Sequence, residues 1–543
     1  MRRHGGTPNL LSVGVAALLA SSSSVFAAAP VPLPSGAPTM SAELAAIRVE
    51  GAERSQVMAF AAALIDGIGP RLTGSPNLAR AAAWARATLQ QIGLSNARLE
   101  DWGEFGDGWE QVNAWARMTA PDLQPLWLQA APWSVPTAGP TTAPVAFVDA
   151  DALTTADLER LKGTLRGKIV LLGAPPRSEP PTQPLSQRLT TEKLRALETG
   201  DEGDPTNAIR STKGRALRLL RTEGVAAIIE PSRASEHGGG TGLIFDDNAA
   251  NIANEPWNPA KASPIPHAVM MVEHYGRLAR LIKAGRSVTM ELNLDTRATG
   301  GQHGFNVLAE LPGSDPKLKT QVVLAGAHLD SWAAGTGATD DGAGVVVAIE
   351  AMRLLKAAGV RPRRTIRLAL WTGEEQGLLG SAGYAHDHLG GWFAPAEPAQ
   401  SPLPPWLRPH GDLTRKAEWD SYYVYFGLDA GSGQIRGLYA EHDPAAAALF
   451  RSWLTPLKDL GATTVAAGSA QGGDQEAFQA LGLPAFAFLQ DPLDYETRAH
   501  HSNLDTFERL SEADLKQAAI VEALILYSAA QRDERFPVKA RSG

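Results

Sequence analysis

No cysteine occurs in the 543 residues of this chain. Disulfide bonds and a lipid-modified cysteine are therefore both excluded. The folded state must obtain its stability from core packing and from any metal ion that it binds.

The sequence also lacks a strong charge of either sign. Fifty Lys and Arg stand against 58 Asp and Glu, which gives a formal net charge of -8 at pH 7. This mild acidity argues against nucleic acid as the main partner and decides nothing about the substrate. Forty-four per cent apolar and 20% charged residues are typical of a globular protein, and the length predicts two to four domains.

The N-terminal apolar segment is too short for a membrane anchor. Arg2 and Arg3 form a basic start, Leu10 to Ala20 is apolar, and Ala27 to Ala29 are small residues. A membrane-spanning helix needs about 20 apolar residues, and this segment has about half of that. We therefore predict that residues 1–29 are a cleavable signal peptide, that the protein is periplasmic or secreted, and that it has no stable membrane insertion.

Polar residues follow a short apolar run in the middle of the chain. Residues 321–325 have the length of a buried strand, and His328, Asp330, Asp340 and Asp341 come shortly afterwards. Because the carboxyl ends of strands open onto the ligand crevice in open α/β sheets, these side chains are placed for metal binding. The alternative is a Gly-rich loop whose Asp residues cap the following helix.

That helix is predicted over residues 345–356, buried, with Glu350 and Arg353 on its polar side.

Three further apolar runs end in the same way. Residues 364–371 precede Glu374 and Glu375, residues 422–428 precede Asp429, and residues 484–489 precede His500 and His501. Two adjacent carboxylates cannot do the same job, because one can face a metal while its neighbour faces the water bound to that metal. Imidazole and carboxylate groups together suit zinc.

Five segments resemble one family in composition and order. They are G-A-H-L-D-S (326–331), T-D-D-G-A-G (339–344), T-G-E-E-Q-G-L-L-G-S (372–381), G-L-D-A-G (427–431) and H-H-S-N-L-D-T (500–506). The chain is similar to the co-catalytic di-zinc exopeptidases, which include bacterial leucyl aminopeptidases and plasma glutamate carboxypeptidase.

The resemblance implies an α/β fold with a mixed, mainly parallel sheet between helices, and an inserted β-rich protease-associated domain. The expected divisions are residues 30–125 for the first part of the catalytic domain, 126–295 for the inserted domain, 296–535 for the zinc-binding part and 536–543 for a tail.

It also implies the roles of individual residues. Asp340 would bridge two zinc ions, His328 and Asp429 would bind one of them, and Glu375 and His501 the other. Glu374 would be the general base on the bridging water, and Asp330 would orient His328. The family also has a cis peptide bond after the bridging residue, here between Asp340 and Asp341.

Three assignments leave alternatives open. His501 is preferred over His500 as the ligand because family members place it four residues before an acidic residue, here Asp505; His500 is then an oxyanion donor or a packed loop residue. Asp474 would recognise an α-amino group or cap a helix. Arg71, in a loop like that of the plasma carboxypeptidases, would contact substrate or form a structural salt bridge.

Two other segments are predicted to be loops. Glu375 and Asp429 lie 54 positions apart, and the Pro-rich stretch between them predicts a surface insertion near residues 387–415. The Gly-rich, acidic tract around Gly238 to Asp247 would line the cleft or form a mobile surface loop, and the second interpretation is favoured.

The function predicted from these features is zinc-dependent hydrolysis of terminal bonds of peptides or dipeptides, with two zinc ions per chain. A single-zinc acyltransferase like glutaminyl cyclase and a receptor-like binding module that has lost its ligands are the alternatives. The sequence does not determine which peptide end is attacked, and it leaves a homodimer open.

Overall fold

The computed structural model describes residues 42–537, except 151, 178, 201–212, 234–241, 248–254 and 394–411. The predicted signal peptide, most of the Pro-rich insertion and residues 538–543 of the predicted tail lie outside the described residues. Within the described part of the chain, no helix is both long and apolar enough to cross a bilayer.

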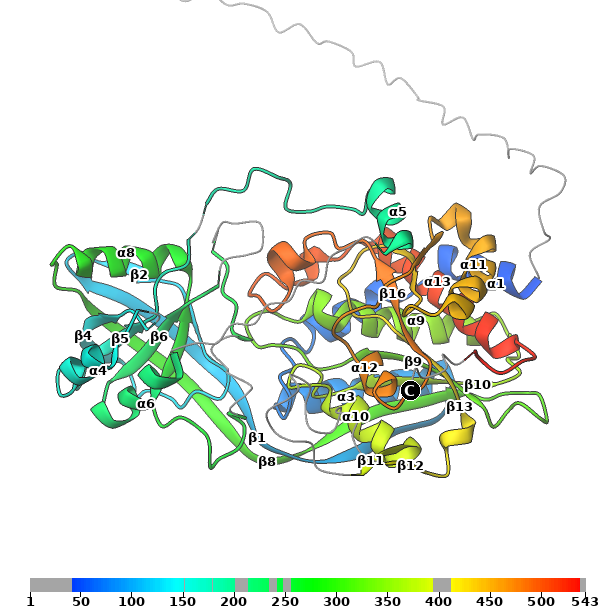
Figure 1. The fold of residues 1–543 in the computed structure, drawn as a ribbon, viewed down its shortest axis with the longest axis horizontal. Helices are drawn as coiled ribbons and strands as arrows, with labels where there is room; N and C mark the ends of the chain where they lie inside the picture. The colour runs from blue at the N-terminus through cyan, green and yellow to red at the C-terminus, as the bar shows by residue number, and fades with distance from the viewer. Residues whose placement is uncertain are drawn as a thin grey trace, which may run out of the picture. The chain divides into compact units, whose positions relative to one another are not determined.

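One large mixed sheet runs through the described chain (Figure 1), in the order β15-β14-β16-β13-β9-β10-β8-β4-β5-β6-β7-β3, with β1 paired to β8 and to β2. Its strands are β1 Ser95–Ala120, β2 Gln124–Leu126, β3 Leu128–Ala130, β4 Thr141–Val148, β5 Ile169–Leu172, β6 Ala227–Pro231, β7 His267–Met270, β8 Thr289–Leu311, β9 Val322–His328, β10 Thr365–Trp371, β13 Tyr422–Gly427, β14 Ile435–Tyr439, β15 Thr464–Ala466 and β16 Ala485–Gln490. β10, β9, β13 and β16 are parallel neighbours, so their carboxyl ends share one edge.

Helices cover both faces of this central part: α1 Ala42–Glu53, α2 Val57–Ala61, α3 Pro76–Ile92, α5 Thr191–Thr199, α9 Ala343–Ala357, α10 Leu379–Tyr384, α11 Pro444–Leu454, α12 Gln475–Gln479 and α13 Glu512–Gln531. Three others, α4 Thr155–Leu161, α6 Lys213–Glu223 and α8 Val272–Lys283, lie beside strands β4 to β6 at the other end of the sheet (Figure 1). Shorter helical turns are η1 Ala62–Asp66, η3 Ala338–Gly342, η4 Ala385–Leu389, η6 Trp419–Ser421, η7 Thr455–Leu460, η8 Tyr495–Ala499 and η9 Phe507–Arg509. The predicted mainly parallel α/β fold is confirmed.

Strand β9 shows why the central runs are apolar at every position. Val323 and Ala325 belong to the core that contains α9 and α13, while Leu324 belongs to the core on the other side with Phe478. Because successive side chains of a strand point to opposite faces, a strand covered by helices on both sides needs apolar residues throughout.

The polar side predicted for α9 is buried. Glu350 is fully buried and Arg353 is 8% exposed. Arg353 donates to Glu350 over 2.7 Å and to Glu50 of α1 over 2.8 Å. Helix α1 therefore covers the face that the sequence pattern places toward solvent, and an ion-pair network replaces the contact with water.

The strands β1 and β8 form one long antiparallel pair, from Ser95 opposite Glu310 to Ala120 opposite Thr289. The domain boundaries predicted at 125/126 and 295/296 lie in β2 and β8, so they divide continuous strands. We call residues 126–295 the inserted region. It contains α4, α5, α6 and α8 as well as strands, so β-rich is an incomplete description of it.

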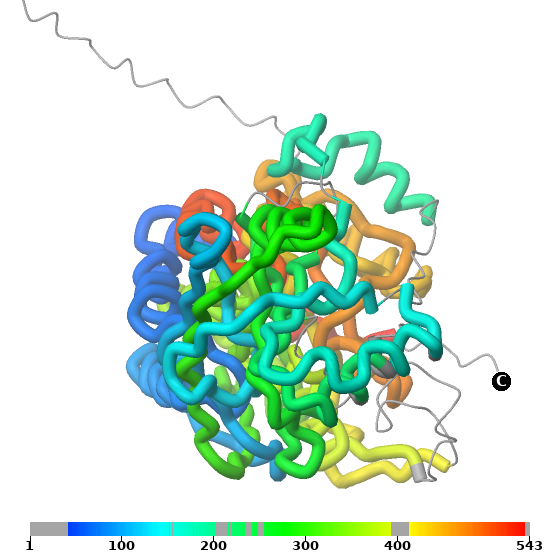
Figure 2. Tube along the Cα trace, turned by 90° about the vertical axis from the view of Figure 1, so that its left-hand side faces the viewer, coloured from blue at the N-terminus to red at the C-terminus, as the bar shows by residue number. Residues whose placement is uncertain are grey.

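One segment of the inserted region lies on the central sheet. Figures 1 and 2 both show α5 beside the C-terminal part of the chain, and Ala467 next to β15 donates its backbone N–H to Leu197 over 2.9 Å. Arg188 donates to Asp491 and Asp514 over 3.0 and 2.7 Å.

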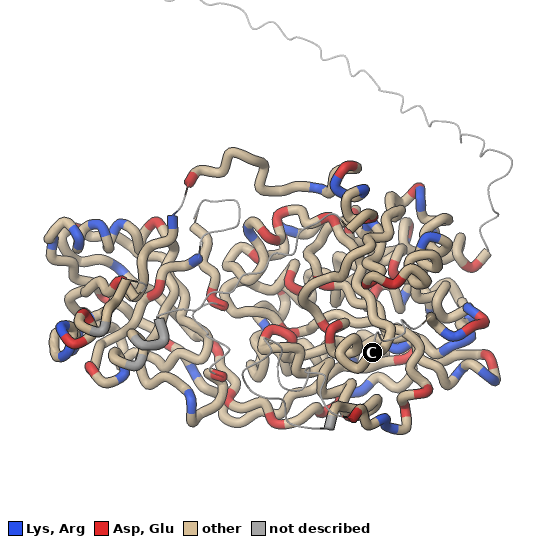
Figure 3. The backbone as a smooth tube through the Cα atoms, viewed as in Figure 1, with Lys and Arg blue, Asp and Glu red and all other residues tan. Residues whose placement is uncertain are grey.

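Acidic and basic residues are interspersed along the described backbone (Figure 3).

Candidate metal centre

Four parallel strands bring the predicted ligands to one edge of the sheet. His328 is the last residue of β9, Glu375 follows β10, Asp429 follows β13, and His501 follows β16 after the turn η8. Since these strands are neighbours, side chains up to 173 positions apart in the sequence meet there. The sheet topology therefore places the site.

The carboxylate of Asp340 lies between two groups of side chains. Its Oδ1 is 3.2 Å from His328 Nε2, which is also 3.5 Å from Asp429 Oδ1. Its Oδ2 is 3.3 Å from His501 Nε2, which is also 3.1 Å from Glu375 Oε2. One carboxylate thus faces both groups, one with each oxygen.

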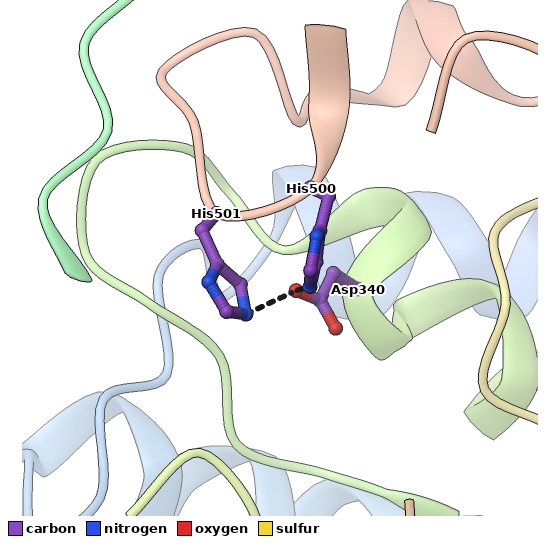
Figure 4. A group of neighbouring side chains, drawn as sticks. All are labelled: Asp340, His500 and His501. Atoms are coloured by element: carbon purple, nitrogen blue, oxygen red, sulfur yellow. Dashed lines mark ion pairs between the residues drawn. The ribbon is translucent and has the colours of Figure 1, made fainter. Parts of the chain in front are cut away.

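Both neighbouring histidines point toward Asp340, as Figure 4 shows. The Nε2 of His500 is 3.9 Å from Asp340 Oδ2, farther than that of His501. The ring of His500 stacks on Tyr495 with the ring centroids 4.7 Å apart, and its Nδ1 lies 3.6 Å from Glu496. This geometry favours His501 as the ligand and leaves His500, about a third exposed, at the edge of the site.

The donor set fits divalent cations. Asp340 Oδ2 and Glu375 Oε1 are buried and have no hydrogen-bond partner among the described residues. Buried carboxylate oxygens without partners are costly, and a cation that they coordinate would remove that cost. The two groups offer imidazole nitrogen and carboxylate oxygen, which is the chemistry that zinc takes.

The orientation of His328 is fixed by its own loop. Its Nδ1 lies 3.0 Å from the backbone carbonyl of Asp330 and 3.7 Å from the Asp330 carboxylate. Because the carbonyl can only accept, Nδ1 carries the proton and the Nε2 lone pair faces Asp340.

The Asp330 carboxylate contacts other parts of the site. It accepts from Thr73 Oγ1 over 2.9 Å and from the backbone N–H groups of Glu374 and Glu375 over 3.4 and 3.3 Å. Asp330 therefore links the loop of His328 to the two glutamates.

Two buried carboxylates support the backbone around Asp340: Asp505, and Asp341, whose oxygens accept backbone N–H groups instead of joining either group of side chains. Asp505 accepts from the N–H and hydroxyl of Thr339 and from the N–H of Asp340, and burial raises the pKa of Asp505 to about 7. Asp341 accepts from the N–H of His328 over 3.2 Å. The predicted cis bond between Asp340 and Asp341 is present.

Glu374 lies beside the two candidate metal-binding groups of side chains without belonging to either. It is partly exposed, unlike Glu375. Burial of the carboxyl group raises the pKa of Glu374 well above its usual range; His328 opposes this effect, and Asp429 and Asp474 add to it.

Asp474 makes no helix cap, although it stands at the start of α12. Its side chain is 3% exposed, and its Oδ1 has no hydrogen-bond partner among the described residues. Burial, opposed by Ser381 and His328, raises the pKa of Asp474 to about 8. The capping alternative is thereby corrected, and an unpartnered carboxylate oxygen remains near Asp429 and Glu374.

Arg71 has a different environment from the one predicted. It is fully buried, and its guanidinium donates to the backbone carbonyls of Leu329, Thr336 and Gly337 over 2.7, 2.8 and 2.8 Å. Neither a substrate contact nor a salt bridge describes this arrangement. Arg71 holds together both ends of the loop between His328 and Asp340.

The acidic tract of the inserted region also differs from its favoured prediction. Its residues 242–247 are described, and they are not a free surface loop. Asp246 is fully buried, and Asp247 Oδ2 lies 3.0 Å from His501 Nδ1. No spacing rule connects residue 247 with residue 501, so this contact could not be predicted from the sequence.

Comparison with known proteins finds a matching family model and similar proteins. Residues 306–525 match the sequence model of peptidase family M28. Carboxypeptidase Q of Rattus norvegicus is 28% identical over 478 residues, which covers 87% of this chain and 85% of the rat protein.

Solved structures show the same fold. A peptidase M28 precursor from Shewanella amazonensis SB2B superposes with a TM-score of 0.62 at 26% identity, covering 92% of this chain and 98% of that one. BSAP, a zinc aminopeptidase from Bacillus subtilis, gives a TM-score of 0.51 at 19% identity, covering 88% and 95%.

Proposed function

This chain belongs to peptidase family M28 and is a metallo-exopeptidase, and we propose that it uses two zinc ions to hydrolyse short peptides with a free α-amino group. The observation that supports the proposal most directly is the Asp340 carboxylate, which faces His328 with one oxygen and His501 with the other.

The residues assigned to each ion follow from the two groups. His328 and Asp429 would hold one zinc, Glu375 and His501 the other, and Asp340 both. When bound, the two ions supply positive charge that favours ionised water and stabilises a developing oxyanion.

Glu374 is the proposed proton carrier. Its carboxylate takes a proton from the attacking water and later delivers it to the leaving amine, as a general base and then a general acid. The raised pKa makes Glu374 a better proton acceptor, although bound cations would oppose that shift. At the edge of the site, His500 donates to the oxyanion.

Asp474 is proposed to bind the substrate's α-amino group. A buried carboxylate oxygen without a partner, beside the metal-type groups, is suited to accept from an ammonium group. The related proteins are called carboxypeptidase Q, after the other terminus. In a dipeptide, the bond next to the amino end is also the bond next to the carboxyl end. Dipeptides are therefore the substrates that fit both recognition of an α-amino group by Asp474 and the name carboxypeptidase.

Two further predictions, of which the first concerns residues outside the described part of the chain, complete the proposal. Residues 1–29 would direct export and be removed, which makes the mature protein periplasmic or secreted. Residues 126–295 would be a protease-associated domain.

A peptide panel tests the proposed specificity. The zinc-loaded protein is assayed with one dipeptide in three forms: unblocked, N-acetylated and C-amidated. We expect hydrolysis of the unblocked and amidated forms and at least a tenfold loss of kcat/KM for the acetylated form. Preference for the acetylated form would contradict amino-end recognition and favour attack that requires only the carboxyl end. In the matched variant Asp474→Asn, the penalty for acetylation should shrink.

A further inference from the structure

We infer that Asp247 of the inserted region is a positioning residue for His501, so that the inserted region completes one of the two metal-binding groups. The inference rests on the proposed function, because it concerns how tightly that group holds zinc.

The direct contact fixes the imidazole of His501. Asp247 Oδ2 lies 3.0 Å from Nδ1, while Nε2 faces Glu375 and Asp340 at 3.1 and 3.3 Å. A carboxylate at Nδ1 keeps the proton on that nitrogen, directs the Nε2 lone pair toward the ligand carboxylates and makes Nε2 more basic. His328 has the same arrangement, but its Nδ1 partner is the Asp330 carbonyl of its own loop.

The backbone of His501 also needs support. Its φ is 61°, in the left-handed region that side-chain-bearing residues seldom adopt and that surrounding contacts must maintain. The inserted region supplies such contacts two residues later. The Asn503 amide accepts from Ile244 N–H over 2.7 Å, and the Asn503 backbone N–H donates to Ile244 carbonyl over 3.0 Å.

Neighbouring residues of the inserted region strengthen the same docking. Phe245 forms a β-bridge with Ser502, and Asp246 accepts from Ala333 N–H over 3.1 Å. Ala333 follows Trp332, whose ring packs edge-on against the His501 ring at 5.7 Å between centroids. Residues 242–247 therefore contact the His501 loop directly and, through Ala333, the segment that packs on its ring.

A second segment of the inserted region holds the start of the same loop. Gln187 donates its backbone N–H to Leu493 over 2.9 Å, and Thr497 Oγ1 donates to the Leu185 carbonyl over 2.6 Å. The polypeptide from residue 493 to 503 is thus bonded to the inserted region on both sides of His501. This geometry explains how a region outside the central sheet can influence the affinity of a metal site at the sheet edge.

Zinc affinity tests the inference without relying on turnover. Wild type, Asp247→Ala and Asp247→Asn are stripped of metal and titrated with zinc against a chromophoric chelator, and bound zinc is counted by mass spectrometry. We expect Asp247→Ala to bind one zinc as wild type does and the other roughly 10- to 100-fold more weakly. Asp247→Asn keeps an acceptor oxygen and should lose less.

The control is Asp157→Ala, in the same region, whose carboxylate bonds to Thr154 and Arg160 and which should leave both affinities unchanged. In a His501→Ala background, Asp247→Ala should have no further effect on zinc, which separates positioning from a general loss of folding.

If Asp247→Ala binds both ions as tightly as wild type, the inference is wrong while the proposed function stands. If Asp247→Ala does not fold, the decision rests on Asp247→Asn: wild-type affinity for both ions in that variant also overturns the inference. Wild type that binds no zinc would contradict the proposed function itself.

Discussion

Glu374 and Glu375 are adjacent in the sequence but have different surroundings. Glu375 is buried with one oxygen 3.1 Å from His501 Nε2, whereas Glu374 is partly exposed. The Glu374→Gln variant keeps the size and shape of the side chain but replaces the carboxylate, which can accept a proton, with a neutral amide. We expect unchanged zinc content and a kcat lower by roughly 10² to 10⁴-fold, the usual contribution of a positioned general base. Near-wild-type turnover would assign the proton transfer to another group.

Alanine substitutions of the two neighbouring histidines should have different effects on zinc content and turnover. His501→Ala should remove about one zinc per chain, because its Nε2 faces two ligand carboxylates. His500→Ala should keep both ions and lower kcat by roughly 10² to 10³-fold, as for loss of an oxyanion donor. Mass spectrometry of bound zinc, combined with kcat and KM, separates the roles. The reverse pattern of zinc loss would exchange the two assignments.

Glu522 in α13 gives a pH-dependent stability. Both of its carboxyl oxygens are buried without a hydrogen-bond partner among the described residues, and burial raises its pKa from 4.5 to about 8. The folded state therefore retains a proton that the unfolded chain releases. The stability associated with protonated Glu522 is full below about pH 4.5 and is lost as the pH rises through about 8, by up to about 1.4 kcal/mol per pH unit.

The Glu522→Gln variant imitates the protonated form at every pH. Its free energy of unfolding, measured by urea titration between pH 5 and 9, should decline less with pH than that of wild type. Glu512→Gln, at the exposed start of the same helix, is the control and should retain the wild-type slope. Equal slopes for wild type and Glu522→Gln would show that Glu522 is ionised in the folded state.

The strand ends of the central sheet were predictable, because an apolar run followed by His, Asp or Glu has a simple physical meaning. The residues that hold those ligands in position were harder to predict. Asp505 and Asp341 accept backbone N–H groups, and nothing in a sequence distinguishes such a carboxylate from a surface one. Glu350 and Arg353 resemble a solvated helix face until α1 is placed over them. Contacts between distant segments, such as Asp247 with His501, depend on the tertiary fold alone.

The loop between β9 and η3 depends on Arg71, whose guanidinium donates hydrogen bonds to backbone carbonyls at both ends of that loop. Arg71→Met would remove the guanidinium donor from the Leu329 and Thr336 carbonyls, while the Gly337 carbonyl would keep only the N–H of Gly342. We expect a loss of at least about 2 kcal/mol in the free energy of unfolding. Zinc affinity should fall as well, since the loop carries His328 and Asp340. Exposed Arg80, changed to Met, is the control. A raised KM with unchanged stability would instead indicate a substrate contact.

The whole molecule combines a helix-covered sheet with an inserted region joined through the long β1 and β8 pair. The sheet edge supplies every predicted ligand, and the inserted region holds the loop of one of them. Since zinc would bind the folded state and connect four strand ends, metal should stabilise the fold as well as permit the reaction.

Zinc titration of the chelator-stripped protein, with the rate of hydrolysis of an unblocked dipeptide recorded at each addition, tests the di-zinc account most directly. The account predicts no measurable hydrolysis before zinc is added and a rate that rises to a plateau at about two zinc ions per chain. A stripped protein with full activity, or a plateau at one zinc, would contradict it.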